Sequence, residues 1–253
     1  MSIFKSSNPA LSGKTFDNLS FSTDTASVMT VKGTMDKLGF MTIMLVAGAV
    51  FSWKAFYDGA SYAQSLMWIG GIGGFVAAIA MIFKKEWAGY LAPAYGVLEG
   101  LFLGAISAMY DYAFQERMPN IIFNAVGLTI GTVVAMFLLY RFGVIKATQR
   151  FKSIVMTATA AIAVFYIVVM VLRLFNVSMP FMHDSSPLGI GISLFIVGIA
   201  AMNLIMDFDM IEQGAAAGAP KYMEWYGAFG LLVTIVWLYL EMLRLLSRLS
   251  SRN

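Results

Sequence analysis

Long apolar stretches alternate with short polar ones along most of the chain. Each of seven stretches holds about 20 mostly apolar residues, the length that a helix needs to cross the hydrocarbon core of a bilayer. The stretches cover approximately residues 38–56, 65–83, 89–110, 121–140, 154–175, 188–209 and 225–246. The connections between them are too short for a second folded domain. The pattern therefore predicts an all-α integral membrane protein, a seven-transmembrane-helix bundle over residues 38–253.

The first 37 residues differ from the rest of the chain because they are polar and contain Pro9 and Gly13 as helix breakers. They have no apolar core after a basic start, so they do not form a secretory signal peptide. We expect residues 1–37 to be a cytoplasmic tail. Its segment from Thr25 to Lys37 is either a short surface helix or disordered, and both interpretations stay open.

Composition narrows the functional classes. Apolar and aromatic residues make up 59% of the chain and charged residues 12%, whereas a soluble domain has about 25% charged residues. We therefore expect the lipid bilayer as a partner and no nucleic acid. Cysteine is absent, and we find no phosphate-binding glycine loop, nucleophile elbow or metalloprotease motif. No enzymatic activity is expected, and no cofactor apart from a bound or transported calcium ion.

The orientation follows from the distribution of lysine and arginine, which favour cytoplasmic loops. Lys84 and Lys85 follow the second span, and four cations lie between Arg141 and Lys152 after the fourth. The tail and the even-numbered loops are therefore predicted to be cytoplasmic. Seven crossings place the C-terminus outside, although arginines recur from Arg244 to Arg252. A re-entrant or interfacial last helix is the alternative.

Small residues recur at intervals of four within several spans. In membranes, close contact between small residues supplies packing energy that the hydrophobic effect does not supply. The ridges consist of Gly96, Gly100 and Gly104 in the third span, Gly70 and Gly74 in the second, and Gly127 and Gly131 in the fourth. This spacing predicts a tightly packed bundle and says nothing specific about a substrate.

Glu99 lies about ten residues into the third span, near the middle of the membrane. A carboxylate at that depth costs roughly 2.5–3.5 kcal/mol on insertion scales, so it needs a partner, water or a bound proton. We expect Glu99 to line an ion route. The alternative is a neutral acid that hydrogen-bonds to a neighbouring helix.

A second group of acids, Asp207, Asp209 and Glu212, lies at the end of the sixth span. Asp209 and Glu212 are three residues apart and share a helix face, whereas Asp207 points elsewhere. Neighbouring carboxylates hinder one another's ionisation and offer oxygen ligands suited to Ca²⁺. Asp209 and Glu99 are the candidate calcium ligands. A solvated acidic helix end is the competing interpretation.

Two further charged positions complete the candidates. Glu241 in the last span lies three residues before Arg244, a spacing that predicts a local ion pair. Arg173, near the outer end of the fifth span, either extends to the membrane surface or reaches an acidic partner.

Three segments resemble the Bax inhibitor-1 family, also called the transmembrane Bax inhibitor motif family, and its bacterial branch in particular. They are Leu91–Gly104 around Glu99, Met206–Gly214 around Asp209, and Leu238–Glu241. The resemblance implies a pH-sensitive Ca²⁺ leak in which an acid of helix six and one of helix seven share hydrogen bonds as a proton-sensing latch. Asp209 matches the first position. Glu241 is the best match for the second, where the family has aspartate.

The latch pairing has alternatives. If the last helix starts near Tyr222, the 19 residues to Glu241 span about 28 Å, so Glu99, Asp207 or Glu212 are other candidate partners of Asp209. Our functional hypothesis is a pH-sensitive calcium leak channel of a bacterial inner membrane, with Asp209, Asp207 and Glu241 as the sensor. The alternative is an interaction protein that modulates a membrane protease through its cytoplasmic tail.

Overall fold

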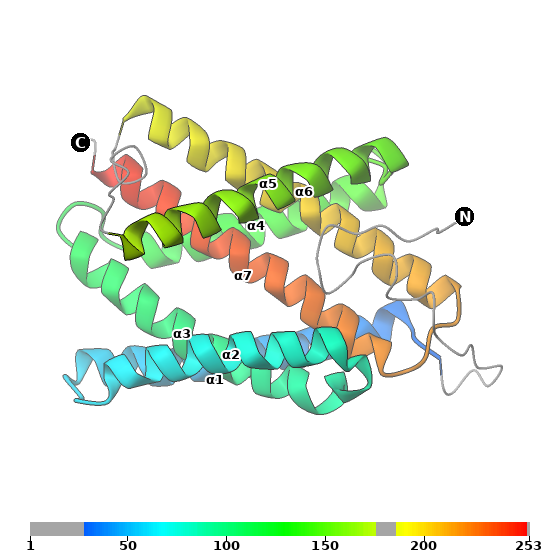
Figure 1. Ribbon diagram of the computed structural model, residues 1–253, viewed down its shortest axis with the longest axis horizontal. Coiled ribbons are helices and arrows are strands. Elements are labelled where there is room, and N and C mark those ends of the chain that lie inside the picture. The colour runs from blue at the N-terminus through cyan, green and yellow to red at the C-terminus, as the bar shows by residue number, and fades with distance from the viewer. Residues whose placement is uncertain (1–27, 176–185, 252–253) are drawn as a thin grey trace. The chain divides into compact units, whose positions relative to one another are not determined.

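The computed structural model describes residues 28–175 and 186–251, except for the side chain of Arg173. Within these ranges, seven α-helices are long and apolar enough to cross a membrane, and Figure 1 shows them along the chain. The predicted all-α fold of seven spans is confirmed, and the protein is a multi-pass membrane protein.

The observed helices match the predicted spans to within seven residues at either end. They are α1 (Val31–Tyr57), α2 (Ala63–Phe83), α3 (Ala88–Phe114), α4 (Ile121–Arg141), α5 (Gln149–Leu174), α6 (Pro187–Ala216) and α7 (Met223–Ser250), with a short 3₁₀ turn, η4 (Lys85–Trp87), before α3. The largest differences are an earlier start of α1 and a later end of α6. Helix α7 is continuous over 28 residues.

Polar caps account for two of the helix starts. The Thr30 side chain accepts a hydrogen bond from the Gly33 amide at 2.9 Å, and Ser186 caps α6 in the same way at Gly189. Pro187 occupies the first position of α6, where its missing N–H costs nothing. Because Thr30 starts α1, residues 31–37 continue into the first span and are not a separate surface helix. Residues 1–27 of the predicted tail lie outside the described residues.

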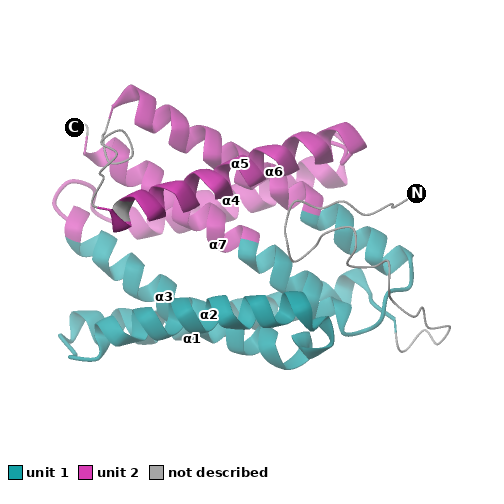
Figure 2. Cartoon of the chain, viewed as in Figure 1, with its two compact units in different colours: residues 1–112, 207–233 teal, residues 113–206, 234–253 magenta. Residues whose placement is uncertain are grey.

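The chain forms two compact units, coloured separately in Figure 2. Unit 1 consists of residues 1–112 and 207–233, and therefore contains α1, α2, most of α3, the end of α6 and the start of α7. Unit 2 consists of residues 113–206 and 234–253, with α4, α5 and the remaining parts of α6 and α7.

In unit 1, the glycine ridge of α3 lies directly against the backbone of α1. A Cβ atom on Gly100 would lie 2.1 Å from the Leu45 carbonyl oxygen, and one on Gly104 would lie 2.1 Å from that of Ala49. No side chain fits into such a gap. The packing predicted from the four-residue spacing is therefore present between these two helices.

The ridges of the second and fourth spans differ from each other. A Cβ on Gly70 of α2 would lie 2.5 Å from the Leu98 carbonyl oxygen of α3, so α2 also packs closely. In α4, a Cβ on Gly127 or Gly131 meets no described atom within 4 Å. The close packing predicted at these two glycines of α4 is therefore not observed in the described part of the chain. The spacing of glycines along one helix does not specify which other helix lies against them.

The core of unit 2 is formed by Ile162 of α5 and by Ile196 and Ile199 of α6, with Tyr166 and Trp237 packed against them. The outward faces of the helices remain apolar: large hydrophobic side chains on α1, α2, α4 and α5 are exposed, as expected for surfaces in contact with lipid acyl chains. By contrast, 72% of the residues in the most apolar 18-residue segment of α7 are buried. In α4 and in α5 the corresponding share is 17%. Of these seven spans, α7 therefore has the largest buried share.

Candidate functional site: buried carboxylates and their partners

The acids predicted on α6 and α7 differ in exposure. Asp207 is 0% exposed and Glu241 is 1% exposed, whereas Asp209 is half-buried and Glu212 is exposed. Asp209 Oδ2 accepts a hydrogen bond of 2.5 Å from the Gln213 amide, one turn further along α6. Burial thus separates Asp207 from the other two acids of this helix end.

Glu99 lies half-buried on α3, in unit 1. The Tyr95 hydroxyl, one helical turn earlier, is hydrogen-bonded to its carboxyl group. The carboxyl group also approaches α2, because a Cβ added to Gly74 would lie 3.0 Å from Glu99 Oε2. The absence of a side chain at Gly74 therefore leaves room for this acid beside α2.

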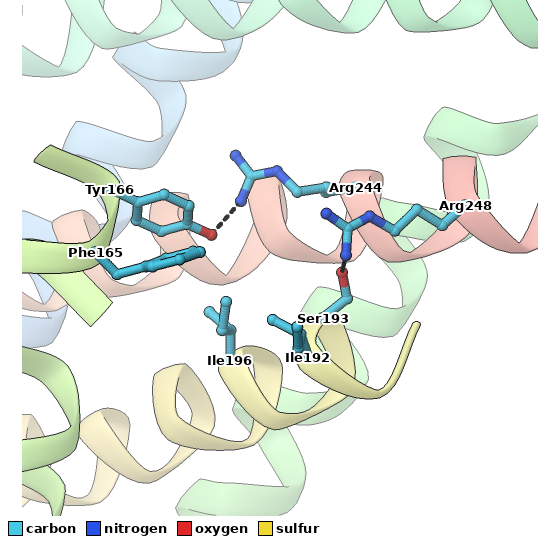
Figure 3. A pocket seen from close by; sticks show the side chains of 7 residues that line it. All are labelled: Phe165, Tyr166, Ile192, Ser193, Ile196, Arg244 and Arg248. Carbon is cyan, nitrogen blue, oxygen red and sulfur yellow. Dashed lines mark hydrogen bonds between the residues drawn. The ribbon is translucent and has the colours of Figure 1, made fainter. Parts of the chain in front are cut away.

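Glu241 is the centre of a hydrogen-bonded network in unit 2. Its Oε1 atom accepts from the Tyr166 hydroxyl at 2.8 Å and from Trp237 Nε1 at 3.3 Å. Arg244 Nη1 lies 2.6 Å from the same oxygen, so the ion pair expected from the three-residue spacing is present. Arg244 also donates to the Tyr166 hydroxyl at 2.5 Å (Figure 3). The carboxylate therefore links α7 to α5 through charge-assisted hydrogen bonds.

Arg248, one turn beyond Arg244, is 7% exposed. Its Nη1 atom donates to the Gly189 carbonyl and to the Ser193 hydroxyl, the second at 2.7 Å. Both acceptors belong to the first turns of α6. The two arginines of α7 thus fasten this helix to α5 and α6 within unit 2.

Sequence reasoning missed Glu224, which is completely buried in the first turn of α7. Its Oε1 atom accepts from both the amide and the hydroxyl of Thr30, each at 2.9 Å. Lys221 lies 3.0 Å from the same oxygen, and the Lys37 ammonium group pairs with Oε2. We call Glu224, Thr30, Lys37 and Lys221 the Glu224 cluster. It fixes the start of α1 to the start of α7 in unit 1.

Two features of the sequence pointed to Glu224. An acid in the first turn of a helix interacts favourably with the helix dipole, and Lys221 is three residues away. No residue near Glu224 in the sequence indicates that it contacts Lys37 or Thr30, which lie 187 and 194 positions away.

The segment before α1 is held by backbone contacts as well. Val28 and Pro220 form an isolated antiparallel bridge, and the Met29 amide donates to the Ala219 carbonyl at 2.6 Å. The Met29 side chain is 2% exposed. The chain therefore enters α1 pinned to the connection between α6 and α7.

We expect Gly33→Ala to disturb the Glu224 cluster. A Cβ at position 33 would lie 2.2 Å from Glu224 Oε1, so the carboxylate would have to leave Thr30 and the lysines. Alanine raises helix propensity by up to about 1 kcal/mol over glycine, yet we expect a lower thermal unfolding temperature in detergent. Gly39→Ala in the same helix is the matched control, since no described atom lies within 4 Å of a Cβ there. Equal effects of the two substitutions would contradict this role of Gly33.

Two predicted relationships stay predictions. Asp209 belongs to unit 1 and Glu241 to unit 2, and the hydrogen bonds given above for each carboxylate lie within its own unit, so the proton-sensing latch is untested. Among the described residues, no three His, Cys, Asp or Glu side chains gather as a metal site would require. Calcium binding by Asp209 and Glu99 therefore stays a prediction as well. The side chain of Arg173 lies outside the described residues.

Comparison with known proteins gives one family match. The family model described as Bax inhibitor 1 like matches residues 8–251, nearly the whole chain. No curated protein and no solved structure gives a significant match. The chain belongs to the Bax inhibitor 1 like family.

Proposed function

We propose that this protein conducts calcium or another cation across a bacterial inner membrane, with its N-terminus cytoplasmic, and that protonation of buried carboxylates controls the conductance. The main support is the burial of Asp207 and Glu241, 0% and 1% exposed, in helices long enough to span a membrane. The distribution of cations between the loops supports the orientation.

The physical basis of the control is the cost of a buried charge. An ionised carboxylate inside the protein is stable only while it is paired and hydrogen-bonded. For Glu241 the compensation comes from Arg244, Tyr166 and Trp237. Proton uptake would remove the attraction to Arg244 and weaken the link between α7 and α5. Protonation of this carboxylate would then change the packing of these helices.

Carboxylate oxygens also supply the cation chemistry. Hard oxygen ligands suit Ca²⁺, and Glu99 places one such group beside α2 at mid-helix in α3. In this proposal Glu99 lines the route of the ion, and Asp207, Asp209 and Glu241 respond to protons. Asp209 and Glu99 are the residues that would contact the calcium ion.

The test is Ca²⁺ flux into proteoliposomes, measured with an entrapped fluorescent indicator between pH 5 and pH 8. Asp207→Asn and Glu241→Gln replace an ionisable group by a neutral one of the same shape. We therefore expect each variant at pH 8 to show the flux that the wild-type protein shows at pH 5. Glu99→Gln should lower the flux at every pH, because it removes a charge along the route.

Glu116→Gln is the matched control, because Glu116 is an exposed carboxylate in the connection between α3 and α4. Its flux should follow the wild-type pH profile. Wild-type protein without Ca²⁺ flux at any pH would contradict the proposed conduction. A pH profile that is the same in all variants would contradict control by these acids.

A further inference from the structure

The Glu99 carboxyl group depends on a single hydroxyl group for its polar contact within unit 1. The Tyr95 side chain, one turn earlier on α3, donates a hydrogen bond to it. In the part of the chain that the structure describes, Glu99 forms no ion pair, and Tyr95 is the titratable side chain that acts on it. The orientation of this acid therefore follows the position of the Tyr95 hydroxyl.

The Tyr95 ring is in turn held by α7. Its centroid lies 4.9 Å from that of Phe229, and the two ring planes make an angle of 89°. In this arrangement the positive edge of one ring meets the negative face of the other. Tyr95 is 4% exposed and Phe229 is 1% exposed. Because protein surrounds both rings, the Tyr95 hydroxyl cannot move far unless the start of α7 moves as well.

Helix α2 limits Glu99 from another direction. A Cβ on Gly74, which is buried, would lie 3.0 Å from Glu99 Oε2. One turn earlier, a Cβ on Gly70 would lie 2.5 Å from the Leu98 carbonyl oxygen, so the two backbones approach closely here. Backbone atoms cannot rotate away as a side chain can. The carboxyl group thus lies between a fixed hydrogen-bond donor and a nearby backbone.

We propose that Tyr95 is the positioning residue of Glu99 and that the start of α7 sets its position through Phe229. The Glu224 cluster fixes the first turn of α7 to the start of α1, so contacts run without a gap from that cluster along α7 to Tyr95 and Glu99. The inference rests on the proposed function in one respect: Glu99 lines the route of the ion. A movement of the α7 start then turns this carboxyl group and changes the conductance.

Labelling with dicyclohexylcarbodiimide tests the contact without any ion flux. The reagent attacks protonated carboxyl groups in apolar surroundings, and mass spectrometry of the purified full-length protein, after digestion, measures the adduct at Glu99. A hydroxyl that donates to a carboxylate favours its charged form, so Tyr95→Phe should raise the labelling of Glu99 at pH 9 roughly tenfold. Tyr90→Phe is the matched control on the same helix, because Tyr90 is 86% exposed, and it should be labelled like the wild-type protein.

Phe229→Leu tests the part played by α7. It keeps the Tyr95 hydroxyl but removes the ring that holds it, so we expect labelling between that of the wild-type protein and that of Tyr95→Phe. The proposal is overturned if Tyr95→Phe is labelled no more than the wild-type protein, including no labelling in either. Wild-type labelling of Phe229→Leu overturns the role of α7. Absence of Ca²⁺ flux would contradict the proposed function, whereas the labelling still decides the role of Tyr95.

Discussion

Gly100→Ala is expected to destabilise the protein, although alanine is the better helix former. The new methyl group would lie 2.1 Å from the Leu45 carbonyl oxygen and 2.9 Å from its carbon. These are backbone atoms of α1, which cannot rotate away as a side chain can. Helices α1 and α3 would have to separate, and overpacking of this kind costs about 1–3 kcal/mol. Gly104→Ala should act alike, since Ala49 and Ser52 face it at 2.1 and 2.3 Å.

Thermal unfolding in detergent, followed by tryptophan fluorescence, measures this effect. Gly127→Ala is the matched control, because no described atom lies within 4 Å of a Cβ at that position of α4. There the helix propensity of alanine acts alone and should leave stability unchanged or raise it by up to about 1 kcal/mol. If Gly100→Ala unfolds at the same temperature as Gly127→Ala, close packing of α1 against α3 is not what Gly100 provides.

Glu224→Ala is expected to have the largest effect of a single side-chain deletion. It would leave the Thr30 amide and hydroxyl without their acceptor and Lys37, whose side chain is 19% exposed, without its carboxylate. Removing one partner of a buried ion pair costs about 3–5 kcal/mol, since the remaining charge is not compensated. Glu224→Gln should cost less, because the amide oxygen can still accept from Thr30.

A double-mutant cycle separates the ion pair from other effects of the substitution. We expect Lys37→Ala combined with Glu224→Ala to cost clearly less than the sum of the two single changes, because the second change removes the uncompensated charge. Glu116→Ala, at an exposed carboxylate, should change the unfolding temperature little. Additive effects of Lys37→Ala and Glu224→Ala would show that the two residues do not stabilise the protein as a pair.

The completely buried acids differ from the pair to which the family resemblance points. The family resemblance implies Asp209 and Glu241 as the sensor. However, Asp209 is only half-buried, whereas Asp207 and Glu224 are completely buried. A carboxylate that is surrounded by protein depends most on its partners for its charge. The flux measurements on Asp207→Asn therefore address the acid of α6 whose protonation should have the greater structural effect.

The sequence by itself determined the seven spans, because the length of an apolar stretch is a local property and the bilayer sets the length required. It also determined contacts within one helix, such as Glu241 with Arg244, since residues three or four apart always share a face. The repeated glycines of α3 were informative for the same reason.

Only the tertiary structure decided which helix faces each of these surfaces. The Lys37–Glu224 pair joins residues 187 positions apart, and Arg248 reaches Ser193 across 55 positions. Such contacts depend on the rotation and approach of whole helices, and hydropathy along the chain does not specify either. For this reason equal glycine spacing packs α3 against α1 but leaves no described atom within 4 Å of a Cβ at Gly127. For the same reason the most buried acid of α7, Glu224, lies in its first turn, at the edge of the predicted span.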